Sequence, residues 1–348
     1  MTGGGTLGPV TPLIAVAIEW QRQENEVTVE WIGTPGGPER ELVERAGFHF
    51  QSLSVPKLSR DKWWTWGLIM PLLAQSSYKA YQILKEMQPD IVFTAGGFTS
   101  VPVVWMAKVL GIPTWVHQLD VLPGLANRLM APMATRVSVT WEESAEAFGA
   151  DKTLVVGGVV RSEIHQGSRE VFLKKYKLDP QRKTVLVFGG GTGAADMNAT
   201  MEVIGPDLAS KMNVVHLTGK GKMIDSLQSI GPNYLALDFL DEDMKHALAA
   251  ADVLVARAGM GTILEVLALQ KATVLIPLPG SQQLHNTRIA QERDFASVIE
   301  HLTPQVLKQE ILKLALDRTV ADRLKRNARK TLTMEADRKI VSKAMELV

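Results

Sequence analysis

Glycines recur at four places just ahead of a helix-like segment. The four glycine loops are residues 3–8, 96–100, 189–194 and 257–262. Glycine lets the backbone turn tightly and approach a ligand closely. A helix that begins at such a loop points free N–H groups and the positive end of its dipole at that ligand. The four loops therefore favour an anionic ligand such as a diphosphate.

Two common phosphate-binding patterns are absent from these loops. No Gly-Lys-Ser/Thr follows any of them, and none is a clean GxGxxG with an acidic residue at the expected distance. ATP hydrolysis and dinucleotide binding are therefore disfavoured. Any one loop is equally consistent with an ordinary turn between a strand and a helix. Four loops spread over two sheets favour a ligand held between two domains, at the carboxyl ends of both sheets.

Apolar strand-like segments alternate with amphipathic helix-like segments along the chain. Val27, Val29 and Trp31 alternate with polar residues, which is the period of a strand. Further strands are expected at residues 90–94, 113–116, 136–139, 153–156, 184–188, 213–217, 252–255 and 273–276, and helices at 243–250 and 262–269. This alternation predicts an α/β fold in which helices cover both faces of parallel sheets.

The length of 348 residues indicates two domains of ordinary size. We place the boundary at residues 157–161, so that the first domain covers 1–160 and the second 161–331. The chain reaches a glycine loop by Gly3, where a sheet of this kind normally has a strand first. We therefore expect that the first strand was lost or that the true start lies upstream.

Composition narrows the function classes. The formal net charge is +1, so no global field attracts nucleic acid, and the chain has no cysteine for disulfides, thiolate metal sites or a thiol nucleophile. No secretory signal is recognisable, and the expected compartment is the cytoplasm. The most apolar stretch, residues 63–74, is shorter than the roughly 20 residues that a spanning helix needs.

One segment has the composition of a membrane-surface contact. Residues 57–73 hold apolar and aromatic side chains just after Lys57, Arg60 and Lys62. Tryptophan favours the headgroup level of a bilayer, and basic residues favour anionic lipid. We expect membrane contact through Trp63, Trp64, Trp66, Leu68 and Ile69. The alternative is a buried loop packed on the first domain.

The glycine loops lie within longer motifs that resemble the MurG family of glycosyltransferases, in glycosyltransferase family 28. The first loop resembles that family's GGTGGHxxP opening. The residues at 123–128, Pro-Gly-Leu-Ala-Asn-Arg, are similar to its PGLANR, and His-Leu-Thr-Gly-Lys at 216–220 to its HQTGK. The run from Arg257 through Glu265 to Asn286 resembles its SRAGAxTxxE…VPxP…HQ segment. The match covers nearly the whole chain in the right order.

The resemblance implies the GT-B fold, with two Rossmann-like domains facing across a cleft and a C-terminal helix, residues 332–348, packing back on the first. It implies an inverting, metal-independent transfer of N-acetylglucosamine from UDP-N-acetylglucosamine to an undecaprenyl-diphosphate-linked muramoyl-pentapeptide, a step of peptidoglycan synthesis. No cofactor is expected. The partners would be the UDP-sugar, the lipid-linked acceptor and an anionic membrane surface at the cytoplasmic face, with the protein peripheral.

The resemblance also implies roles for the matched residues. Glu265 would bind the ribose hydroxyls, Leu240 would place its backbone against the uracil, and Asn286 would read the sugar. Arg161 would be the diphosphate's cation. The diphosphate would be surrounded by Gly191, Met260, Gly261, Thr262, Ile263 and Leu264. The sugar side of the first domain would be lined by Thr6, Leu7, Gly8 and Asp120.

Several positions depart from the family pattern and put the general base in question. Pro9 replaces the loop histidine, and Gln118, Leu119 and Asp120 replace Glu, Gln and Asn. Asp120 is our first choice of base and His117 the second, although His117 also fits a hydrogen-bonded core histidine. The acids at 241–243 resemble a metal-binding DxD, but acids before a helix also stabilise its N-terminus, and no metal site is expected.

Two other functions use the same loops. The first is another UDP-N-acetylglucosamine enzyme on this fold, either an epimerase or a glycolipid transferase, with a different acceptor region. The second is a degenerate binding protein that keeps the nucleotide-sugar site without catalysis, which the changes at Pro9 and Gln118 would suit.

Overall fold

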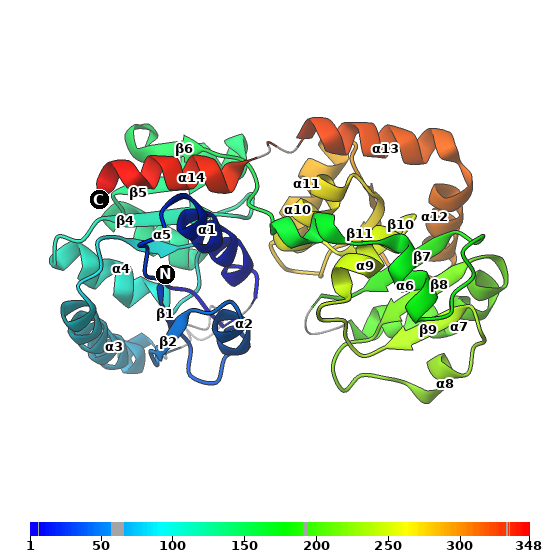
Figure 1. The fold of residues 1–348 in the computed structure, drawn as a ribbon, viewed down its shortest axis with the longest axis horizontal. Helices are drawn as coiled ribbons and strands as arrows, with labels where there is room; N and C mark the ends of the chain where they lie inside the picture. The colour runs from blue at the N-terminus through cyan, green and yellow to red at the C-terminus, as the bar shows by residue number, and fades with distance from the viewer. Residues whose placement is uncertain (6, 57–65, 191–193, 332, 334) are drawn as a thin grey trace. The chain divides into compact units, whose positions relative to one another are not determined.

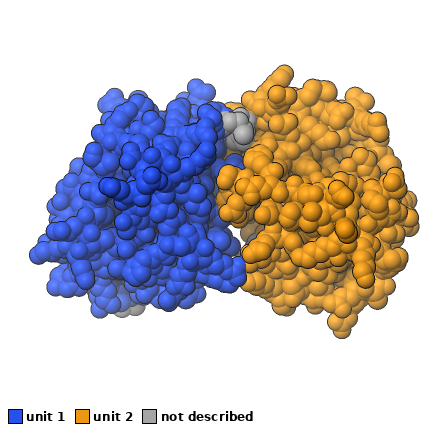
Figure 2. Space-filling model, in the orientation of Figure 1, with its two compact units in different colours: residues 1–160, 333–348 blue, residues 161–332 orange. Residues whose placement is uncertain are grey.

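The computed structural model describes residues 1–5, 7–56, 66–190, 194–331, 333 and 335–348, without the side chains of 66–68. The chain divides into two compact units. Unit 1 is residues 1–160 with 333–348, and unit 2 is residues 161–332 (Figure 2). In both units, parallel strands alternate with helices along the chain (Figure 1).

Unit 1 contains six named strands, all paired in parallel. They are β1 (Glu30–Gly33), β2 (His49–Ser52), β3 (Val92–Thr94), β4 (Thr114–Gln118), β5 (Arg136–Val139) and β6 (Thr153–Val155). Strands β3 to β6 form one ladder, and β1 pairs with β2. Thr2 joins the two groups, because it forms parallel bridges to Ile32 and to Thr94. Residues at the start of the chain thus lie at the centre of this sheet.

Helices cover both faces of the unit 1 sheet. They are α1 (Val10–Gln23), α2 (Glu39–Arg45), α3 (Trp66–Met87), α4 (Ser100–Val109), α5 (Leu125–Met130) and α14 (Ala336–Ala344). Val92 of β3 packs in a cluster with side chains of α3 and α4. The next residue, Phe93, points to the other face, where its ring meets Trp20 of α1 edge-on. Alternate residues of one strand therefore build two cores.

The C-terminal helix α14 belongs to unit 1, although its sequence follows unit 2. It packs against α1, as Figure 1 shows. Ile340 and Val341 are buried, while Arg338 pairs with Glu19 of α1 at 3.3 Å. Lys339 donates a hydrogen bond to the carbonyl of Val155 at the end of β6. These contacts hold α14 against α1 and β6 of unit 1.

Unit 2 is built on one parallel sheet in the order β12-β11-β10-β7-β8-β9. The strands are β7 (Thr184–Phe188), β8 (Asn213–Leu217), β9 (Tyr234–Leu237), β10 (Val253–Arg257), β11 (Ala272–Ile276) and β12 (Ser297–Val298). The helices are α6 (Arg169–Lys175), α7 (Ala195–Lys211), α8 (Asp225–Gln228), α9 (Met244–Ala250), α10 (Met260–Leu269), α11 (Gln283–Glu292), α12 (Pro304–Leu316) and α13 (Arg318–Thr331).

The strands of unit 2 are apolar on both faces because each face is covered by helices. Val185 and Val187 of β7 pack with side chains of α7, α12 and α13. Leu186 and Phe188 of the same strand pack with side chains of α6, α9 and α10. A strand buried on both sides reads as a continuous apolar run, which is the signal in the sequence.

Candidate functional site

In unit 2, the two central strands are the point where the chain changes direction. The chain runs from β7 outward through β8 and β9, then returns to β10 beside β7 and continues outward through β11 and β12. Ligands of open parallel sheets bind at such a point, outside the carboxyl ends of the strands. Glycine loops follow both strands there. One includes Gly189 and Gly190, and the other has Gly259 directly ahead of α10.

Glu265 and Arg161 form an ion pair in unit 2. The Nη2 of Arg161 donates to Oε1 of Glu265 at 2.8 Å, and both side chains are mostly buried, 32% and 19% exposed. Glu265 lies on α10, one turn after its start, whereas Arg161 is the first residue of the unit. The buried Nε of Arg161 has no hydrogen-bond partner within the described residues. The two groups that we expected to bind ribose and diphosphate are thus brought together.

A second ion pair fixes the loops around this point. Arg257, 8% exposed at the end of β10, donates to Asp196 at 2.5 Å and to the carbonyl of Pro277. Asp196 lies in the first turn of α7 and accepts a hydrogen bond from the backbone of Met197. The guanidinium therefore ties together the segments that follow β7, β10 and β11.

The other expected donor-site residues of unit 2 lie around the same edge. Met260 to Leu264 form the first turns of α10, with Gly261 and Thr262 partly exposed. Leu240 is buried in an apolar cluster. Asn286, at the start of α11, is buried and donates from Nδ2 to the carbonyl of Ala258 at 3.1 Å. This hydrogen bond ties the start of α11 to the glycine loop at 257–262.

In unit 1, two glycine loops meet at the carboxyl edge of the sheet. Gly97 has φ +94°, and a Cβ there would lie 2.9 Å from the carbonyl oxygen of Gly4. Only glycine allows both the backbone conformation and this approach. Leu7 and Gly8, expected on the sugar side, follow in the same first loop and precede α1.

His117, our second choice of base, is a buried histidine of β4. Its Nδ1 lies 2.8 Å from Oγ of Ser138, and its Nε2 lies 3.5 Å from Oγ1 of Thr140. Burial lowers the pKa of the imidazole to about 4, against a smaller opposing contribution from a hydrogen bond to Ser138. A neutral ring with neighbours at both nitrogens matches the core histidine that the sequence also allowed.

Asp120, our first choice, is partly exposed and lies two residues after the end of β4. Gln118 holds its backbone, since Nε2 of Gln118 donates to the Asp120 carbonyl at 2.6 Å and to that of Leu122 at 3.2 Å. Oε1 of Gln118 accepts from Nδ2 of Asn127 at 2.6 Å. Gln118 therefore acts as a structural amide that shapes the turn carrying Asp120.

Several expected residues lie outside the part of the chain that the structure describes. They are Thr6, Gly191, Trp63 and Trp64, while Trp66 and Leu68 belong to α3 without described side chains. The expectation for Ile69 is wrong, because its side chain is buried, 8% exposed, on the inner face of α3. Among the described side chains of this helix, the large exposed apolar ones are Met70, Leu72 and Tyr78.

The acids at 241–243 do not gather around a metal. Asp243 precedes α9, but its carboxylate makes no cap to that helix. It pairs with Lys175 and accepts from the hydroxyl of Tyr176 at 2.8 Å, both from the α6 segment. Across the described residues, no group of three or more His, Asp or Glu side chains is arranged to hold a metal ion.

Two polar networks were not predicted from the sequence. Glu39 is a fully buried carboxylate at the start of α2, whose partners are backbone amides of distant loops. His216 is buried between the hydroxyl of Tyr234 at 2.8 Å and Oδ1 of Asn198 at 3.1 Å, and burial lowers its pKa to about 4. The sequence carries one sign of the His216 network, because His216 is a polar residue among the apolar residues of β8.

Sequence comparisons place this geometry among known proteins. Residues 1–139 match the glycosyltransferase family 28 N-terminal domain, and residues 184–343 match the family's C-terminal domain. The UDP-N-acetylglucosamine–N-acetylmuramyl-(pentapeptide) pyrophosphoryl-undecaprenol N-acetylglucosamine transferase of Geobacillus thermodenitrificans is 34% identical. That match covers 95% of this chain and 93% of the relative.

Solved structures agree on the fold. A crystal structure of Acinetobacter baumannii MurG has a TM-score of 0.75 at 24% identity, over 99% of this chain and 98% of that one. The UDP-GlcNAc 2-epimerase of Neisseria meningitidis, bound to UDP-GlcNAc, has a TM-score of 0.69 at 14% identity, over 97% and 96%. These likenesses concern the fold, which is the GT-B fold of two Rossmann-like domains.

Proposed function

The chain belongs to glycosyltransferase family 28, and from this premise we propose that it transfers N-acetylglucosamine from UDP-N-acetylglucosamine to a lipid-linked muramoyl-pentapeptide. This is the reaction named for its relative at 34% identity over nearly the full length of both chains. The observation that carries the proposal is the pairing of Arg161 with Glu265 in the unit whose two central glycine loops favour a diphosphate.

The donor site that we propose lies at the carboxyl ends of β7 and β10. The ribose hydroxyls donate to the carboxylate of Glu265, and the diphosphate accepts from Arg161 and from the free N–H groups at the start of α10. Leu240 faces the uracil through its backbone, and the loop that includes Gly191 completes the diphosphate site. An arginine suits this place because its planar fork matches phosphate oxygens.

The chemistry is a single displacement with inversion. The acceptor hydroxyl oxygen bonds to the anomeric carbon, the bond from that carbon to the diphosphate oxygen breaks, and the acceptor proton passes to a base. UDP leaves carrying the negative charge. Arg161 and the N-terminus of α10 stabilise that charge as it develops, and electrostatic contributions of this kind are commonly the largest in catalysis.

For the base we propose Asp120 ahead of His117. Asp120 is partly exposed on a turn held by Gln118, at the carboxyl edge where we place the sugar side with Thr6, Leu7 and Gly8. His117 is buried, and the pKa of about 4 leaves it a weak proton acceptor near neutral pH. Asn286 would read the sugar from unit 2 if its contact with Ala258 is exchanged for the ligand.

The acceptor is an undecaprenyl-linked lipid, so the protein works at a membrane surface. Among the described helices, none is both long and apolar enough to cross a bilayer. We propose peripheral contact with anionic lipid at the cytoplasmic face through the segment 57–73, without the buried Ile69 and Leu73. The exposed Met70 and Leu72 at the start of α3 support this assignment. Trp63, Trp64, Trp66 and Leu68 are proposed to add to the same contact.

Transfer of labelled N-acetylglucosamine to a synthetic lipid-linked muramoyl-pentapeptide tests the function directly. We expect product formation that requires the acceptor, releases one UDP per sugar and continues in the presence of a metal chelator. Conversion of UDP-N-acetylglucosamine without any acceptor would instead indicate an epimerase, whose fold is similar. Tight UDP binding without turnover on any acceptor would indicate a degenerate binding protein.

A further inference from the structure

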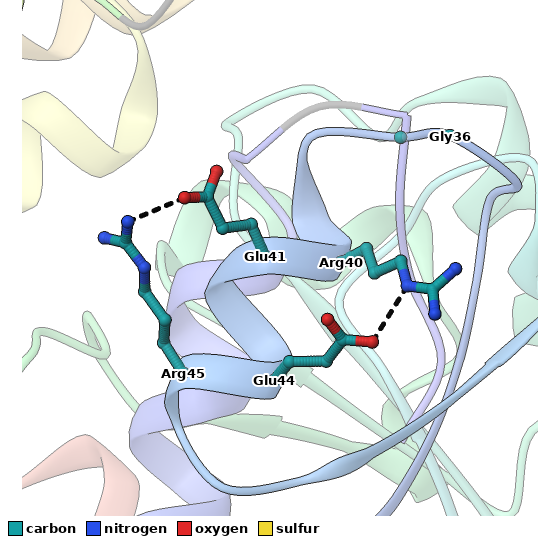
Figure 3. Close-up of a pocket in the computed structure, with 6 residues that line it drawn as sticks. Gly36, Arg40, Glu41, Glu44 and Arg45 are labelled. Atoms are coloured by element: carbon teal, nitrogen blue, oxygen red, sulfur yellow. Dashed lines mark hydrogen bonds and ion pairs between the residues drawn. The ribbon is translucent and has the colours of Figure 1, made fainter.

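Glu39 begins α2, and its side chain is completely buried, whereas Glu41 and Glu44 of the same helix face solvent. Glu41 pairs with Arg45 at 2.6 Å and Glu44 with Arg40 at 2.8 Å, one turn apart on the helix surface (Figure 3). Such pairs are ordinary on a solvated helix. A buried carboxylate needs partners for its charge, so Glu39 requires a separate explanation.

Backbone amides of two loops supply those partners. The N–H of Thr34 donates to Oε1 of Glu39 at 2.7 Å, and the N–H of Gly5 donates to Oε2 at 3.2 Å. Thr34 follows β1, and Gly5 lies in the first glycine loop. The hydroxyl of Thr34 lies 3.0 Å from that of Thr99, just ahead of α4. One carboxylate therefore connects two loops directly and a third through Thr34.

The surrounding glycines make room for this carboxylate. A Cβ at Gly37 would lie 2.2 Å from Oε2 of Glu39, and a Cβ at Gly4 would lie 2.0 Å from Oε1. Neither glycine has a positive φ, so the backbone conformation does not require glycine at either position. For Gly37, the three nearest atoms all belong to Glu39. Glycine at these two positions therefore leaves the space that the Glu39 carboxylate occupies.

We propose that Glu39 is the positioning residue of the first glycine loop. By holding the amide of Gly5, it fixes the segment that leads to Leu7 and Gly8, which the proposed function places on the sugar side of the reaction. Its own position excludes contact with substrate, because the side chain is fully buried and both oxygens accept from backbone amides. The role is therefore to hold the loop, and the inference rests on the proposed function only for its effect on catalysis.

The test is Glu39→Gln, which keeps the shape but turns an NH₂ group toward one of the two amide donors. Loss of one hydrogen bond to a charged group changes the equilibrium constant for holding the loop in place by roughly tenfold or more. We expect amide hydrogen exchange in residues 3–8 to rise at least about tenfold and kcat to fall by a similar factor. The dissociation constant of UDP, bound in unit 2, stays at the parental value.

Glu39→Ala removes the carboxylate altogether and should raise exchange in residues 3–8 and lower kcat at least as much as Glu39→Gln. Three further variants sharpen the result. Glu41→Gln makes the same chemical change on the exposed side of α2, and we expect parental exchange and parental kcat. Gly37→Ala pushes the carboxylate of Glu39 from its place without removing it, so it should reproduce the Glu39→Ala phenotype. In the double variant Gly37→Ala/Glu39→Ala the clash is gone, and we expect no loss beyond that of Glu39→Ala alone.

The outcomes separate this inference from the proposed function. A folded Glu39→Gln protein whose residues 3–8 exchange at the parental rate overturns the positioning role. A rise in exchange spread over all of unit 1 also overturns it, since Glu39 would then only stabilise the core. Should Glu39→Gln fail to fold, Gly37→Ala carries the exchange measurement. Absence of transfer in the parent protein contradicts the proposed function instead and leaves the exchange result in force.

Discussion

Glu265 and Arg161 are paired at 2.8 Å, so their contributions to ligand binding are interdependent. We expect Glu265→Ala to weaken UDP binding at least about tenfold, because each hydrogen bond to a carboxylate contributes about 1.5–3 kcal/mol. Calorimetry with UDP measures the loss. Glu292→Ala, which removes an exposed carboxylate at the end of α11, is the control and should bind as the parent does.

Uridine separates the two ways in which Glu265 could act. If the carboxylate only binds ribose, Glu265→Ala weakens the binding of uridine and the binding of UDP by the same factor. We expect a larger loss for UDP, because Glu265 also orients the guanidinium of Arg161 toward the diphosphate. Unchanged UDP affinity in a folded Glu265→Ala protein would remove this residue from the donor site.

The proposed base gives a second prediction at the residue scale. Asp120→Asn should lower kcat by about 10²–10⁴-fold at saturating donor and acceptor, which is the usual contribution of a positioned base. UDP affinity should not change. His117→Gln should retain the parental kcat, since the ring is buried and its nitrogens lie near the hydroxyls of Ser138 and Thr140. If Asp120→Asn also retains it, the proton leaves through water or a group of the acceptor.

At the scale of the element, α3 has a buried and an exposed face. Ile69, Leu73, Ala80 and Leu84 are buried at helical spacing, with the side chains of Ala80 and Leu84 in one apolar cluster with α4. Met70 and Leu72 are 62% and 49% exposed at the beginning of the helix. These two apolar side chains therefore lie on the surface of unit 1.

We expect the double variant Met70→Ser/Leu72→Ser to bind anionic vesicles at least about tenfold more weakly, because burying one such side chain contributes about 1.5–3 kcal/mol. Sedimentation with vesicles containing phosphatidylglycerol measures the bound fraction. Leu316→Ser changes an exposed leucine of unit 2 and should bind as the parent does. Equal binding by all three proteins would contradict membrane contact through α3.

Strands buried on both faces could be predicted from the sequence, whereas three of the strands at sheet edges could not. The bounds of β5, β7 and β8 agree with the predicted ranges, and helices cover both sides of β7 and β8. The strands β2, β9 and β12 lie at sheet edges and were missed, whereas the edge strand β6 was predicted at residues 153–156. The three missed strands are only partly buried, so their sequences lack a continuous apolar run.

The candidate site was predictable where its signal is local. Glu265 and the loop before it lie within one short motif, and the structure brings Arg161 to the same carboxylate. Glu39 could not be found in this way, since in the sequence it looks like Glu41, another acid in the first turn of α2. Its partners, Gly5 and Thr34, meet it only through the fold.

At the scale of the whole molecule, the two units repeat one topology. In each sheet the chain runs outward from the centre, returns to the centre and runs outward to the opposite edge, with Thr2 at the centre of unit 1 and β7 at that of unit 2. Each unit has its own buried apolar clusters. Each also holds one buried neutral histidine on an interior strand, His117 on β4 of unit 1 and His216 on β8 of unit 2.

These histidines predict a loss of stability at acid pH in both units. Burial lowers the pKa of each from 6.5 to about 4, so between these values the unfolded chain binds more protons than the folded one. The free energy of unfolding therefore falls as the pH drops from 6.5 toward 4, by up to about 3 kcal/mol for each histidine. Above pH 6.5 neither histidine contributes a pH dependence.

The tryptophans allow the two units to be followed separately. All 8 tryptophans lie at or before Trp141, in unit 1, so their fluorescence reports that unit, whereas circular dichroism reports both. In urea titrations between pH 4 and 7, His117→Gln should flatten the pH dependence of the fluorescence transition, because the amide does not titrate. His216→Gln should flatten the pH dependence of the unit 2 transition, which circular dichroism reports and fluorescence does not. His301→Gln, at an exposed position, should change the pH dependence of neither signal. A fluorescence transition whose pH dependence survives His117→Gln would show that other groups of unit 1 control its acid unfolding.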